Sequence, residues 1–125
     1  MTRLFDSTVL IAHLRGQPEA TSLLRGAVVD NEAAASVLSR VEIEGGMRSG
    51  ERADTARLFS ALQMESVSDA IAARAGGLLR KYRRSHSGID LIDYVIAATA
   101  EELDAELMTL NVRHFPMFKN LRAAF

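Results

Sequence analysis

Short apolar runs alternate along this chain with longer stretches in which apolar residues recur every three or four positions. The short runs predict buried strands at residues 3–5, 33–38, 64–67 and 106–110, with boundaries good to about two to four residues. The longer stretches predict amphipathic helices at residues 7–14, from 18 onward, from 39 onward, around 55–62, from 68 to 82 and at 91–103. A short helical turn at 112–115 and a candidate edge strand from Met117 complete the chain.

Strands that alternate with helices pair in parallel through right-handed crossovers. We therefore expect one domain over residues 1–125, an α/β fold in which a three-layer α/β/α sandwich surrounds a central parallel sheet of four or five strands. Hydrophobic residues make up 48% of the chain and aromatic residues only 6%, which predicts a core of Leu, Val, Ile and Ala.

Composition narrows the possible functions. The chain contains no Cys, which excludes disulfides and thiolate metal sites. It has neither a membrane-length apolar run nor a signal-peptide pattern, so we expect a soluble, cytoplasmic protein that does not contact a membrane. The net charge of −1 does not indicate a general nucleic-acid binder, but acidic metal ligands would cancel basic residues in that count.

Several acidic and amide side chains follow predicted strands or begin predicted helices. Asp6 ends the first strand, Glu42 follows the second, Asp90 and Asp93 open the helix at 91–103, and Asn111 follows the fourth strand. Strand C-termini and helix N-termini share one edge of a parallel sheet, where open α/β sheets bind ligands. Carboxylates gathered there repel one another unless a cation compensates, and oxygen-only ligands favour Mg²⁺ or Mn²⁺. A phosphodiester is the natural substrate of such a site.

Each acid also has a purely structural explanation. Asp6 is a suitable cap for the helix at 7–14, and Ser39 and Glu42 match the capping box S-x-x-E. Asp90 and Asp93 have the same spacing, and we assign Asp90 to capping or to a minor supporting role. The three histidines lack zinc-site spacing, although His114 lies close enough to Asn111 to support the predicted edge.

The basic run Arg80–Arg84 ends the longest predicted helix. We interpret it first as a solvated helix end that complements the helix dipole. The alternative is a phosphate-contacting patch for RNA. Gly45-Gly46 and Gly76-Gly77 lack the Lys and Ser/Thr of a phosphate-binding loop, and no Ser-His-Asp arrangement is indicated.

Four segments of the chain resemble the motifs of PIN domains, in the right order and spacing. They are DSTVLIAHL with Asp6, SVLSRVEIEGG with Glu42, DYVIAATA with Asp93, and TLNVRHF with Thr109, Asn111 and Phe115. Each motif alone is weak, whereas the four together are specific and cover almost the whole chain. The length and the last motif resemble more narrowly the VapC-type toxins of VapBC toxin–antitoxin pairs.

The resemblance implies a sequence-selective endoribonuclease that requires Mg²⁺ or Mn²⁺, forms a homodimer and is inhibited by a VapB-type antitoxin. It implies that Asp6, Glu42 and Asp93 hold the metal and that Asn111 completes the catalytic set, with Thr109 in support. The chain departs from the family at Asn111, where an acid is usual, and at His114, where a further Asp is often found. This departure argues against a second tightly bound metal.

Two alternatives remain at this stage. A non-catalytic PIN-like module would bind RNA or an antitoxin without cleaving RNA, which the missing fourth acid would favour. A receiver-type signalling domain also carries acids at strand ends, but it requires adjacent acids after the first strand and an acid after the third. The third strand runs instead into Ser66-Val67-Ser68.

Overall fold

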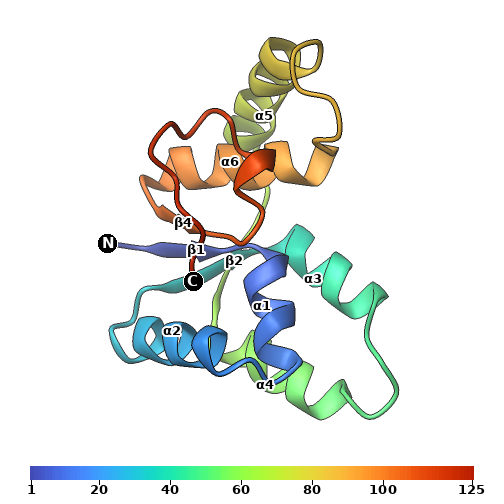
Figure 1. Cartoon of the computed structure of the whole chain (residues 1–125), viewed down its shortest axis with the longest axis vertical. Coiled ribbons are helices and arrows are strands. Elements are labelled where there is room, and N and C mark those ends of the chain that lie inside the picture. The colour runs from blue at the N-terminus through green and yellow to red at the C-terminus, as the bar shows by residue number, and fades with distance from the viewer.

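The computed structural model describes residues 1–125 and contains a four-stranded parallel sheet between two layers of helices. Its strands are β1 (Arg3–Phe5), β2 (Ala33–Ser36), β3 (Gln63–Glu65) and β4 (Glu106–Met108), in the spatial order β3-β2-β1-β4. The predicted α/β/α sandwich is confirmed, with four strands. Figure 1 shows α5 and α6 on one face of the sheet and α1 to α4 on the other.

Six helices connect and cover the strands. They are α1 (Ser7–Leu14), α2 (Pro18–Val29), α3 (Val37–Gly45), α4 (Arg52–Ala61), α5 (Asp69–Tyr82) and α6 (Leu91–Leu103), and a 3₁₀ turn follows at Val112–His114. All six are too short or too polar to cross a lipid bilayer. The bounds predicted for α1 and α6 match those observed.

Both faces of the sheet are buried, as a parallel sheet between helices requires. Side chains alternate along β1, so Leu4 packs toward α6 while the next residue, Phe5, packs toward α1 and α2. Alanines fill most of β2, where all four residues are buried, and they let helices approach the sheet closely. A third apolar cluster joins α5 to α6.

The start of α3 corrects one prediction. The second strand ends at Ser36 rather than at residue 38, and Ser36 caps α3 by accepting a 3.1 Å hydrogen bond from the Leu38 backbone N–H. The predicted capping box of Ser39 and Glu42 is therefore wrong, because Ser39 lies one turn inside the helix and is fully buried. Glu42 then lies in the second turn, free of a capping role.

The tail corrects another prediction, because no edge strand forms after Met117. One backbone hydrogen bond, 2.8 Å from the Ala124 N–H to the Thr109 carbonyl, joins the tail to the residue that follows β4. Its apolar residues pack instead against the cluster under α6. Phe115 is fully buried, and three residues beside it are partly buried: Met117, Phe118 and Leu121. The apolar side chains of the tail are therefore covered without a fifth strand.

The strand order reverses between β1 and β4, which creates a topological switch point. From β1 the chain moves outward to β2 and β3, and it then crosses to the other side of β1 to form β4. The chain segments that follow β1 and β4 therefore lead away from each other. A crevice at that position is the usual ligand site of an open α/β sheet.

Candidate active site

Asp6 lies at the switch point, directly after β1. Phe5 pairs with Met108 in β4, so Asp6 is placed next to Thr109 in the following position. Both residues are buried, with Asp6 5% exposed and Thr109 fully covered. The Thr109 hydroxyl donates to Asp6 Oδ2 at 2.6 Å, while Thr8 donates to Asp6 Oδ1 from its backbone N–H at 3.1 Å and from its hydroxyl.

The hydrogen bond from the Thr8 backbone makes Asp6 the cap of α1, so the structural explanation of this residue is confirmed. It does not account for the burial of the charge. No Lys, Arg or His contacts Asp6, and burial raises the pKa of its carboxyl despite the hydrogen bonds from Thr109 and Thr8. A carboxylate held in this state gains stability from a cation brought to it.

Glu42 reaches the same edge from α3. The Ser7 hydroxyl donates to Glu42 Oε1 at 2.9 Å, and Ser7 directly follows Asp6 in the chain. The second oxygen of Glu42 forms no hydrogen bond in the structure. The sequence suggested Glu42 but not Ser7, although a hydroxyl residue next to Asp6 was visible in the DST segment.

Asp93 and Asp90 form the reciprocal capping box that their spacing predicts. The Asp93 backbone N–H donates to Asp90 Oδ1 at 3.1 Å, and the Asp90 backbone N–H donates to Asp93 Oδ2 at 3.4 Å. Asp93 is also half-buried, and burial raises its pKa, with the neighbouring charge of Asp90 acting in the same direction. Its other oxygen, Oδ1, forms no hydrogen bond.

His114 contacts both Asp93 and Asn111. Its Nδ1 lies 2.8 Å from Asp93 Oδ2 and 2.9 Å from the side-chain nitrogen assigned to Asn111. One imidazole nitrogen carries either a hydrogen or a lone pair, so it cannot donate to Asp93 and accept from Asn111 together. Turning the Asn111 amide by 180° resolves this conflict, because an Nδ1–H could then reach two oxygens.

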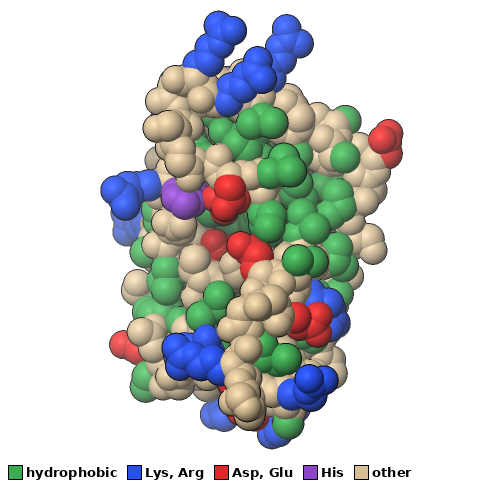
Figure 2. Space-filling model, turned by 90° about the vertical axis from the view of Figure 1, so that its right-hand side faces the viewer, with side chains coloured by type: hydrophobic (Ala, Val, Ile, Leu, Met, Phe, Trp, Pro, Cys, Tyr) green, Lys and Arg blue, Asp and Glu red, His purple; other side chains and the backbone are tan.

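A continuous chain of contacts therefore joins most of the predicted residues. Asn111 donates its backbone N–H to the Thr109 hydroxyl at 2.9 Å, which in turn donates to Asp6. The path runs from Asp6 through Thr109, Asn111 and His114 to Asp93. Figure 2 shows acidic side chains and one histidine together in a hollow on this face of the molecule.

The donor set fits a hard divalent cation, although no group of three His, Asp or Glu side chains is arranged as a complete metal site. Glu42 and Asp93 each keep one carboxylate oxygen without a hydrogen bond, and Asp6 is a buried carboxylate without a cationic partner. Oxygen donors in small number match Mg²⁺ and Mn²⁺ chemistry, in which waters and substrate phosphates supply the remaining ligands.

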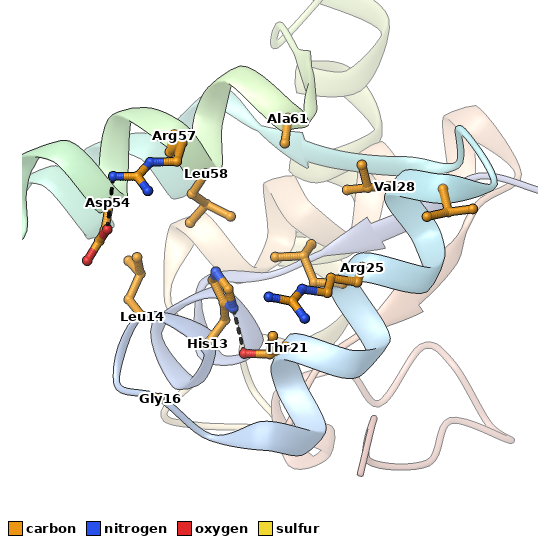
Figure 3. Close-up of a pocket in the computed structure, with 12 residues that line it drawn as sticks. His13, Leu14, Gly16, Thr21, Arg25, Val28, Asp54, Arg57, Leu58 and Ala61 are labelled. Atoms are coloured by element: carbon orange, nitrogen blue, oxygen red, sulfur yellow. Dashed lines mark hydrogen bonds and ion pairs between the residues drawn. The ribbon is translucent and has the colours of Figure 1, made fainter.

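The largest cavity lies elsewhere, between α1, α2 and α4, and has a volume of about 690 Å³. None of the predicted site residues lines it. Figure 3 shows His13 directed into this cavity beside Thr21, whose hydroxyl oxygen is 2.8 Å from His13 Nδ1. Burial, with the nearby charge of Arg25, lowers the pKa of His13, so a neutral imidazole is favoured there.

Comparison with known proteins agrees with this geometry. Residues 3–120 match the PIN domain family. The chain is 50% identical over 122 residues to Ribonuclease VapC10 from Mycobacterium tuberculosis, a match that covers 98% of this chain and 92% of that protein. It is 47% identical over 124 residues to Ribonuclease VapC19 from the same organism, with coverage of 98% and 99%.

A solved toxin–antitoxin complex from Klebsiella pneumoniae contains a chain with the same fold. The two chains superpose with a TM-score of 0.79 at 25% identity, over 99% of this chain and 98% of that one. This chain belongs to the PIN domain family. The receiver-type alternative is thereby excluded, because the match to the PIN family extends over nearly the whole sequence.

Proposed function

We propose that this chain is a divalent-metal-dependent endoribonuclease that hydrolyses RNA phosphodiester bonds, acting as the toxin of a type II toxin–antitoxin system. The observation that carries the proposal is the chain of contacts from Asp6 to Asp93 at the sheet's switch point. Membership of the PIN family and extensive identity to two proteins named ribonucleases support it.

Ribonucleases of this kind in the PIN family generally depend on a divalent metal. We assign Mg²⁺ or Mn²⁺ to this chain because its donors are all oxygens. Asp6 and Asp93 would hold the cation directly or through water, and Glu42 would hold it or orient the attacking water. When bound, the cation would acidify that water and offset the charge that builds on the phosphate.

The remaining residues position these groups. Asn111 would orient the attacking water or the scissile phosphate, and Thr109 fixes Asp6 while it receives the Asn111 backbone N–H. His114 lies against Asp93 Oδ2, so it restrains that oxygen, and Oδ1, which has no hydrogen-bond partner, would be available to a cation. Asp90 supports Asp93 through the capping box.

Two partners belong to the same proposal. We expect inhibition by a VapB-type antitoxin, because the similar fold from Klebsiella pneumoniae was solved as a toxin–antitoxin complex. We also expect a homodimer. Co-expression with a VapB-type antitoxin should yield a complex that copurifies, and sedimentation of the chain alone should give the mass of two copies.

The test is cleavage of labelled single-stranded RNA by the purified chain with Mn²⁺, with Mg²⁺ and with EDTA. Cleavage should require the metal, and Asp6→Asn should reduce its rate by at least about 100-fold. Asp104→Asn is a matched control, because it removes a carboxylate at the opposite end of α6, where the left-handed backbone (φ 51°) also suits Asn. RNA binding without cleavage under every metal condition would establish the non-catalytic alternative instead.

A further inference from the structure

Three arginines line a second cavity at the C-terminal end of α5. Arg80, Arg83 and Arg84 surround a space of about 490 Å³ together with Gly76 and Leu79. The five residues follow the spacing i, i+3, i+4, i+7 and i+8, so they lie on one face of the helix and its continuation. A single helix face therefore supplies all the residues that line the cavity.

The charges of these arginines are uncompensated. Arg80, Arg83 and Arg84 are exposed and form no ion pair. Of the ten other arginines, five pair with an acid and five do not; the paired ones are Arg3, Arg15, Arg40, Arg57 and Arg74. The helix dipole offsets part of the repulsion between these cations. An anion bound between the guanidinium groups would offset the repulsion more directly.

The glycines of α5 have no packing role that would explain them. A Cβ atom added at Gly76 or Gly77 would meet no other atom within 4 Å. Glycine is less favourable than alanine inside a helix, so these two residues weaken the helix without any gain in its own packing. Gly76 lines the space beside the arginines and adds no side chain to it.

A short segment connects this cavity to the candidate active site. Only residues 85–89 separate Arg84 from Asp90, the cap of α6, and a segment of that length spans at most about 20 Å. Figure 1 shows the chain descending from the end of α5 to the start of α6. Figure 2 shows basic side chains projecting at one end of the face that carries the acidic hollow.

We propose that Arg80, Arg83 and Arg84 bind backbone phosphates of the RNA substrate at a distance from the scissile bond. This inference rests on the proposed ribonuclease function. Guanidinium groups bind phosphate oxygens through two parallel hydrogen bonds, and the spacing of the three along one helix face suits successive phosphates of one strand. With a net charge of −1, the chain needs a local cluster of this kind to hold a polyanion beside an acidic pocket.

Direct binding tests the proposal without relying on catalysis. The affinity for labelled single-stranded RNA is measured by fluorescence anisotropy in EDTA across a series of salt concentrations. The plot of log affinity against log salt has a negative slope. Each phosphate contact that is lost should make this slope less steep by about 0.7, so replacing all three arginines by Gln should make it less steep by about 2. Since the two lines should converge near 1 M salt, the Kd at about 0.1 M salt should rise by about 100-fold.

Two controls separate the cavity from general charge. Lys81→Gln removes a cation from the same helix end, but Lys81 does not line the cavity and its ammonium lies 5.4 Å from the Tyr82 ring centroid. Arg25, Arg57 and Arg122 replaced together by Gln reproduce the net charge of the cavity variant at other exposed sites. Equal loss of affinity in this control and in the cavity variant would overturn the proposal, as would wild-type protein that fails to bind RNA at low salt.

Gly76 allows a second test that cannot be explained by unfolding. Gly76→Ala should bind RNA as the wild type does and should be at least as stable, because alanine favours the helix and the site is sterically open. Gly76→Glu places a carboxylate in the cavity and should weaken binding about as much as removal of one arginine. If both variants bind RNA equally well, the cavity does not contact the substrate.

The outcomes distinguish this inference from the function on which it rests. Wild-type protein that binds RNA through the arginines but never cleaves it would refute the nuclease and keep the phosphate site. If the wild-type protein cleaves RNA and the arginine variants cleave it with the same KM, the phosphate site alone is refuted. Inorganic phosphate at millimolar concentration should compete poorly with RNA. If the arginine variants lose antitoxin binding but keep RNA binding, the cavity belongs to a protein partner and the proposal is overturned.

Discussion

The Thr109 hydroxyl donates a 2.6 Å hydrogen bond to the Asp6 carboxylate, although 103 positions separate the two residues in the chain. The bond joins the ends of β1 and β4, the two strands between which the sheet changes direction. It is formed between fully or almost fully buried groups. The geometry at Asp6 therefore depends on correct pairing of the first and last strands.

Replacing Thr109 by Val should destabilise the protein and slow RNA cleavage. The variant keeps the shape of the side chain but leaves the Asn111 backbone N–H without its acceptor and Asp6 without one donor. We expect a loss of about 1–3 kcal/mol in the free energy of unfolding, measured by urea denaturation.

Thr55→Val provides the matched control for that substitution. Thr55 is buried, and its hydroxyl forms no hydrogen bond. Its removal should therefore leave stability unchanged or increase it. Equal destabilisation by the two variants would show that the Thr109 hydroxyl contributes nothing specific to the fold.

The raised pKa of Asp6 predicts how stability changes with pH in the metal-free protein. The pKa in the folded chain lies above the ordinary value of 3.8, so folding favours the protonated form. The stability due to this group is present below 3.8 and is lost as the pH rises through the folded pKa. Asp6→Asn removes this dependence, because its amide does not titrate.

The stability difference between Asp6→Asn and wild type should therefore shift in favour of the variant between pH 3 and pH 7 in EDTA. Using the difference cancels the titration of all other groups, including the raised pKa of Asp93. Addition of Mn²⁺ at pH 7 should stabilise the wild type and not the variant. A difference that stays constant across this pH range would show that Asp6 carries no buried charge.

The observed cap of α3 can be tested with two serines. Ser36→Ala should cost about 1 kcal/mol, because it removes the acceptor of the Leu38 backbone N–H. Ser39→Ala should cost little or should stabilise the chain, since the buried Ser39 hydroxyl has no partner. Thermal unfolding of both variants gives the comparison, and the reverse order would restore the capping box that the sequence suggested.

Asn111→Asp tests the departure of this chain from the family pattern. The new carboxylate would lie against His114 and close to Asp93, so the pocket would become more negative. We expect Mn²⁺ affinity to rise several-fold, as added charge at an oxygen-ligand site raises affinity. A fall in affinity, measured by calorimetry, would show that the amide of Asn111 is needed to position Asp93 or its ligand.

The order of the elements and the edge that collects the acids could be predicted from the sequence, because each depends on local patterns. The helix at 91–103 has a cap, an apolar stripe and a following strand, and its observed bounds agree with the prediction. Asp6 is identifiable because it ends a short apolar run and begins a helix. Parallel pairing then places it beside the residues that follow β4.

The cap of α3 was missed because two serines compete in the segment ASVLSRVE. Val37 and Leu38 are apolar and continue the run of β2, so the pattern extends the strand to residue 38. Both serines are fully buried, and β2 pairs with β3 only as far as Ser36. The deciding factor is therefore where the sheet pairing ends, and that depends on packing far along the chain. The contact between Ser7 and Glu42 depends on the same packing, since it joins two different helices.

His114 illustrates a further limit of the sequence. Its distance from Asn111 suggested a supporting role, but its 2.8 Å contact with Asp93 depends on how the 3₁₀ turn after β4 meets the start of α6. The expectation of a strand in the tail is wrong, because apolar residues after Pro116 are compatible with either a strand or a packed loop. The position of the uncovered apolar surface of α6 decided between them.

Binding of Mn²⁺ to the purified chain, followed by electron paramagnetic resonance, tests the central claim most directly. Asp6, Glu42 and Asp93 are replaced one at a time by the matching amide, with Asp104→Asn as control. Each of the three variants should bind Mn²⁺ at least about tenfold more weakly than wild type, while the control should bind it equally well. Wild-type affinity retained by all three variants would contradict the account, because these carboxylates would then not form one cation site.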